Sequence, residues 1–174
     1  MDYQQAKACS IMPGVEILYF GKDGPEQVET KTSDLYKNTE AITISACLDN
    51  NFCFIHGPDK DFPIPFIWYF CEIAIIIDTH LIEHRDFQMF PQVEQYIQKA
   101  SDIFRVEDQF CTFKMTPEIK QIFKELQQIP LPPTMFHFFM QLKVMEMVLL
   151  LSQLNLYSTN VHFYPYAHLP EKNV

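Results

Sequence analysis

The feature that most constrains the fold is a long apolar segment near the end of the sequence, Thr134–Leu154. Thr134 follows three prolines and predicts a helix start. Apolar residues then recur at helical spacing in two separate stripes, and the few polar residues between them cannot cover a solvated face. A helix that is apolar on more than one side must be buried on more than one side. The sequence therefore predicts a helix with two apolar contact surfaces.

The first stripe has spacings of three and four residues, like the a/d seam of a coiled coil. It comprises Met135, Phe138, Leu142, Met145 and Leu149. The second stripe comprises Phe139, Val144, Met147, Val148 and Leu151. The rest of the domain can cover one stripe, and a second copy of the chain is the simplest cover for the other. We expect a homodimer with the first stripe at its interface; the alternative is that one domain buries the whole helix.

The segments before this helix read mostly as strands. Ile42–Leu48 alternates in the manner of a half-buried strand, and Asp49–Asn51 predicts a turn into a returning strand at Phe52–Ile55. Further strands are expected at Val15–Phe20, Ile67–Asp78 and Phe110–Met115. Ile67–Asp78 is apolar on both faces, so both must be covered. We expect its odd positions to face the core and the later helices to lie over the even side.

A second, shorter helix is expected between the strands and the long helix. Thr116-Pro117-Glu118 is typical of a helix start, because Thr caps, Pro fits the first turn and Glu favours the positive helix end. Together the patterns predict an α+β domain, a β-sandwich or barrel with strands over about 12–115, followed by an antiparallel pair of helices at about 117–128 and 134–154. At 174 residues, the chain is expected to form a single domain over 1–174.

Three segments together resemble the N-terminal domain of bacterial AraC-type transcription regulators. They are MPGVEILYF at Met12–Phe20, FPIPFIWYFCEIAIIIDTHLI at Phe62–Ile82, and the block from Phe110 through Leu154 that closes with FFMQLKVMEMVLLLSQL. The resemblance implies a cupin-like barrel, a small-molecule effector within it and a helix that mediates dimer contacts. It also implies a following domain of two helix-turn-helix units, which is absent from this chain. The segment Gly21–Asp61 is shorter than the family pattern.

The functional hypothesis is therefore the ligand-sensing and dimerisation domain of an AraC-type regulator, not an enzyme. In the barrel we expect an effector pocket near Tyr69 and Cys71, with Trp68 on the opposite face of the strand; ordinary core packing is the alternative for these residues. A stand-alone cupin-like binding protein or enzyme is the alternative function.

Charge and motifs exclude several functions. With 13 basic and 22 acidic residues the net charge is −9, so direct DNA binding is not expected and an anionic membrane surface is disfavoured. No GxSxG, GxGxxG or Walker sequence occurs, and no cofactor is expected. His80 and His84 share the spacing of two ligands on a helix, but no third ligand is evident, so no metal site is predicted. Five cysteines without a CxxC pair indicate free thiols in a cytoplasmic protein, and the unbroken apolar stretches Ile73–Ile77 and Val148–Leu151 are too short to span a bilayer.

Overall fold

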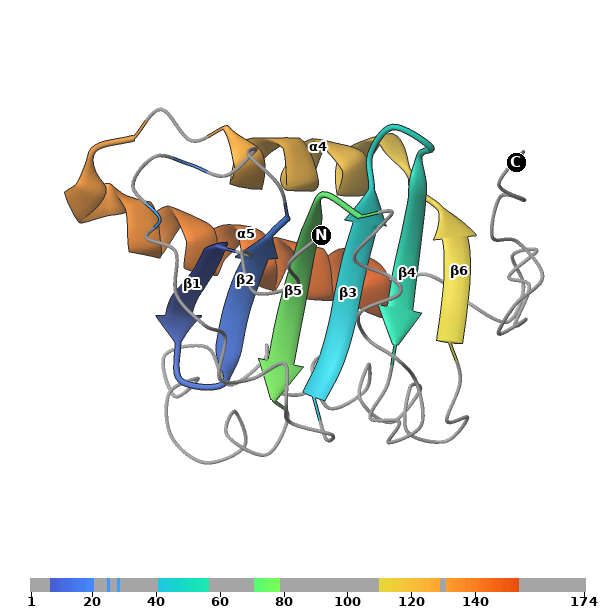
Figure 1. Ribbon diagram of the computed structural model, residues 1–174, viewed down its shortest axis with the longest axis horizontal. Helices are drawn as coiled ribbons and strands as arrows, with labels where there is room; N and C mark the ends of the chain where they lie inside the picture. The colour runs from blue at the N-terminus through green and yellow to red at the C-terminus, as the bar shows by residue number, and fades with distance from the viewer. Residues whose placement is uncertain are drawn as a thin grey trace.

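The computed structural model describes residues 7–20, 25, 28, 41–56, 71–78, 110–128 and 131–153. Within them lies one antiparallel sheet with the strand order β1-β2-β5-β3-β4-β6 (Figure 1). The strands are β1 (Lys7–Met12), β2 (Val15–Tyr19), β3 (Ala41–Cys47), β4 (Phe52–His56), β5 (Ile73–Asp78) and β6 (Phe110–Lys114). Two helices follow, α4 (Pro117–Gln127) and α5 (Pro133–Gln153). The expected α+β class with a C-terminal helix pair is confirmed.

Both tight hairpins form where the local sequence permits them. Gly14, with a φ of 82°, follows Pro13 between β1 and β2, as in a type II turn. Asn51, with a φ of 61°, ends the turn between β3 and β4, and asparagine tolerates this left-handed conformation better than most residues. The turn predicted at Asp49–Asn51 is therefore confirmed, whereas β1 was not predicted.

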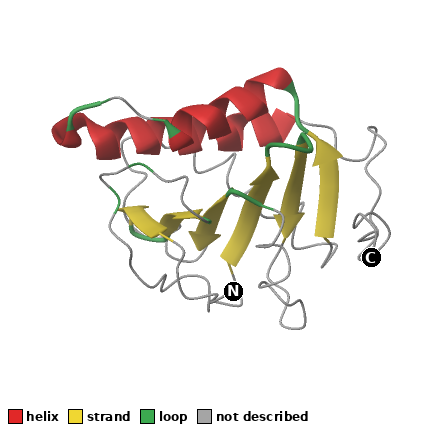
Figure 2. Ribbon diagram, turned by 45° about the horizontal axis from the view of Figure 1, so that its top comes forward, coloured by secondary structure: helices red, strands yellow, loops and turns green. Residues whose placement is uncertain are grey.

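The two helices pack side by side over one face of the sheet (Figure 2). Helix α4 begins as its sequence predicts: the Thr116 hydroxyl accepts a hydrogen bond from the Ile119 amide at 3.3 Å, and Pro117 occupies the first turn. Its buried residues are Ile119, Ile122, Phe123 and Leu126. They share one hydrophobic core with the inward side of α5 and one face of the sheet.

The central strand β5 shows which face of the sheet the helices cover. Its odd positions Ile73, Ile75 and Ile77 belong to the core shared with the helices, whereas Ala74 and Ile76 belong to a separate small cluster on the other face. The expectation that the helices cover the even side of this strand is therefore wrong. Alternation identifies residues that share a face, but it does not say which cover each face receives. The expectation that both faces are covered is confirmed, since all six residues of β5 are buried.

The strand predicted at Ile67–Asp78 lies partly outside the described residues, because the structure describes this segment only from Cys71 onward.

Candidate functional site: the outward face of the C-terminal helix

Helix α5 has two apolar sides, as its sequence predicts, and the two sides differ in how deeply they are buried. The inward side packs on the sheet and α4, and its buried members are Phe136, Met140, Val144, Met147, Val148 and Leu151. Four of the five residues in the second predicted stripe are among these buried residues, and Phe139 packs against the same core while partly exposed. The domain itself therefore covers one of the two predicted contact surfaces.

The first predicted stripe lies on the side of α5 that faces away from the sheet. Residues two positions apart on a helix point about 200° apart, which places Leu142 opposite the fully buried Met140. Met135, Phe138 and Leu142 are 56%, 57% and 42% exposed, whereas Met145 and Leu149 are partly buried, and Met145 also packs against the edge of the core. We call these five residues the outward stripe. Among the described residues, only Phe52 on β4 is a further exposed large hydrophobic side chain.

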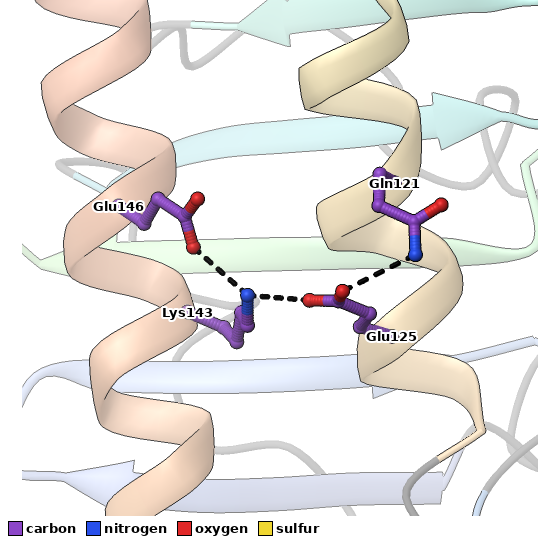
Figure 3. A network of polar contacts seen from close by, with 4 residues as sticks. All are labelled: Gln121, Glu125, Lys143 and Glu146. Carbon is purple, nitrogen blue, oxygen red and sulfur yellow. Dashed lines mark hydrogen bonds and ion pairs between the residues drawn. The ribbon is translucent and has the colours of Figure 1, made fainter.

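A polar network borders the outward stripe on the side of α4 (Figure 3). The Lys143 ammonium group forms ion pairs with Glu125 of α4 and, at 2.9 Å, with Glu146 one turn further along α5. The Gln121 amide donates to the Glu125 carboxylate at 3.2 Å. The hydrogen bonds from Lys143 and Gln121 lower the pKa of Glu125, and the hydrogen bond with Glu125 raises the pKa of Lys143. The network joins the two helices at the surface and limits the apolar stripe on this side.

Two hydrogen bonds attach the helix pair to the first two strands. The Tyr19 hydroxyl of β2 donates to the Leu126 carbonyl of α4 at 2.8 Å in the core, and burial raises the pKa of this phenol. The Gln141 amide of α5 donates to the Ile11 carbonyl of β1 at 2.7 Å. Ile11 lies at the register shift between Ser10 and Met12 of the edge strand β1, so this hydrogen bond attaches α5 to the edge of the sheet. Sequence periodicity did not predict these contacts, since both join residues more than 100 positions apart.

Of the residues expected near the effector, the structure describes only Cys71; Trp68 and Tyr69 lie outside the described residues. Cys71 is buried just before β5, and burial, with smaller contributions from Cys47, Cys53 and Glu72, raises the pKa of its thiol. The neighbouring Glu72 carboxylate accepts a hydrogen bond from the Leu48 amide at 2.8 Å. An effector contact at these positions stays a prediction.

His80 and His84 lie outside the described residues, and the part of the chain that is described holds no group of three or more metal-ligating side chains. By length and composition alone, the segment Thr134–Leu151 of α5 is apolar enough to cross a membrane, and 33% of it is buried inside the protein. The core helix of a globular domain meets the same criterion.

Comparison with known proteins gives no matching family model, no similar curated protein and no similar solved structure.

Proposed function

We propose that this chain is the ligand-sensing and dimerisation domain of an AraC-type transcription regulator, with its sheet forming part of a cupin-like barrel. The observation that carries the proposal is the outward stripe of α5. Its members repeat at intervals of three, four, three and four residues, which is the spacing by which two helices pack along a common seam. The opposite side of the same helix already packs on the sheet.

A second copy of the chain is the occupant that best fits this stripe. A seam of this kind is complementary to itself, and two-fold contacts are the most common arrangement in soluble oligomers. The helix is 21 residues long, or about 30 Å, so two copies can align over several turns. The acidic balance of the chain, with a net charge of −9, opposes an anionic membrane as the alternative occupant.

In this proposal, effector binding changes the populations of two arrangements of the sheet and helices. The contacts from Tyr19 to Leu126 and from Gln141 to Ile11 provide physical connections between the strands and the helix pair. An attached helix-turn-helix domain would respond to this shift in the arrangement of the helix pair. The chain alone, with its acidic balance, is not expected to bind duplex DNA specifically; salt-sensitive, sequence-selective retardation of DNA by the purified chain would contradict this.

The proposal is tested by the mass of the particle in solution. Light scattering at micromolar concentration is expected to give a dimer for the chain and a monomer for Leu142→Asp. Phe52→Asp is the matched control, because Phe52 is equally exposed, at 43% against 42%, but lies on β4. The control variant is expected to remain dimeric. A dimer that survives Leu142→Asp would place the interface on another surface.

A further inference from the structure

The outward stripe of α5 includes two methionines, and one of them is open to solvent. Met135 is 56% exposed, whereas Met145 is partly buried. The other methionines that the structure describes are either partly buried, as is Met12, or at most 4% exposed, as are Met115, Met140 and Met147. Oxidation of a thioether requires that the oxidant reach the sulfur atom. Among the described methionines, a soluble oxidant therefore reaches Met135 most readily.

The described cysteines are poorer targets for an oxidant than this thioether. Cys9, Cys47, Cys53 and Cys71 are all buried, and burial raises the pKa of the Cys71 thiol. A thiol must lose its proton before it reacts, so burial protects it both by limiting access and by keeping it protonated. A thioether has no proton to lose, and its reaction depends on access alone. Both differences favour Met135.

Met135 lies in the part of the outward stripe where a second copy can bury the most surface. Met145 and Leu149 are already partly covered by their own domain, so the remaining area is concentrated at Met135, Phe138 and Leu142. Met135 and Phe138 are three residues apart on the helix and are therefore neighbours on its surface. A change in the polarity of the Met135 side chain acts directly on this area.

We propose that Met135 is a modification site at which a hydroperoxide oxidises the thioether to a sulfoxide and thereby weakens the dimer. This inference rests on the proposed dimer and names a chemical signal that regulates it. The O–O bond of the peroxide breaks and an S–O bond forms. The sulfur loses two electrons, and the peroxide is reduced to water or to an alcohol, which takes up the proton of the peroxide.

The oxidised side chain opposes association because of its polarity. A sulfoxide turns a flexible apolar side chain into a polar one, and the apolar side chains of the outward stripe offer it no hydrogen-bond donor. The reaction takes place in the monomer, where Met135 is exposed, and the modified chain then re-associates more weakly. Reduction of the sulfoxide restores the original side chain, so the modification is reversible.

Hydrogen peroxide added to the full chain, at a concentration near the dimer midpoint, tests this proposal. Mass spectrometry of peptides should locate added oxygen at Met135 well before Met140, the matched control on the same helix. Light scattering should then show a dimer dissociation constant raised at least about tenfold, and reduction by methionine sulfoxide reductases should reverse the change. Met135→Leu keeps a similar volume without the sulfur. This variant should dimerise normally and not respond to peroxide, which also separates Met135 from the cysteines.

Three results would overturn the inference, and only one of them also removes the proposed function. Equal rates of oxidation at Met135 and Met140 would overturn the site. An unchanged dissociation constant after Met135 is oxidised, or an equal response in Met135→Leu, would overturn the regulation and leave the dimer standing. A chain that is monomeric before peroxide is added would remove the dimer, and the regulation with it.

Discussion

The two sides of α5 are similar in sequence and different in environment. Met140 and Met135 are the same residue type on the same helix, but Met140 is fully buried on the sheet and Met135 is 56% exposed. Hydrophobicity alone therefore does not distinguish a side chain that builds the core from one that is available to a partner. The distinction arises from the sheet, which can cover only one side of a helix. The inward side packs in the core of the domain, and the outward side forms the proposed dimer interface.

The largest expected difference between the two sides is in the stability of the fold. Met140→Ala leaves a cavity between α5 and the sheet and is expected to lower the free energy of unfolding by about 2–5 kcal/mol. Met135→Ala is the matched control and should change it by less than about 0.5 kcal/mol when the chain is diluted to the monomer. Urea denaturation of both variants measures the difference. Equal losses would show that the helix is not packed as described.

A smaller effect is expected from the polar anchor on the inward side. Tyr19→Phe removes the hydrogen bond to the Leu126 carbonyl while it keeps the buried ring, and should cost about 1–2 kcal/mol. The exchange of the amides in the last turn of α4 should accelerate, since the bond fixes that end of the helix to β2. An unchanged urea midpoint together with unchanged exchange would show that this contact does not hold α4 on the sheet.

The smallest effect is expected from the ion pair between Lys143 and Glu125, which lies at the boundary between the two sides of α5. A double-mutant cycle with Glu125→Gln and Lys143→Met should give a coupling of about 0.2–1 kcal/mol at neutral pH, because the pair is solvent-accessible. The folded pKa of Glu125 lies below its ordinary value. The contribution of the ion pair to the free energy of unfolding is therefore present above the ordinary glutamate pKa. It is lost as the pH falls through the lower pKa of Glu125 in the folded protein. A coupling that persists at about pH 2 would contradict an ionic origin.

Local patterns in the sequence predicted most of the described elements. The strand β3, the turn at Asp49–Asn51 and the Thr116 cap all depend on neighbouring residues, and the structure confirms each of them. The expectation that β3 is half-buried is wrong, because all seven of its residues are buried and the sheet is covered on both faces. The edge strand β1 was missed, because Lys7 and Ser10 make its sequence look polar. The Pro13-Gly14 turn before β2 is the signal that a strand should precede it.

The candidate site was predictable in part. The residues of the outward stripe follow from helical spacing, but the sequence does not determine which of the two stripes packs on the sheet. Likewise, alternation grouped the odd positions of β5 correctly and assigned the helices to the wrong side. The placement of Glu16, Thr43, Ser45 and Asp78 on one buried face of the sheet was not predicted either, since they come from three strands that only the sheet register brings together.

The most direct test of the central claim is the concentration dependence of the sedimentation coefficient. The chain and its Leu142→Asp variant are compared over the nanomolar to micromolar range. The account predicts that the chain passes from monomer to dimer, and that the folded variant remains monomeric at every concentration. A chain that stays monomeric throughout, or a variant that dimerises with the same midpoint, would contradict the assignment of the outward stripe as the dimer interface.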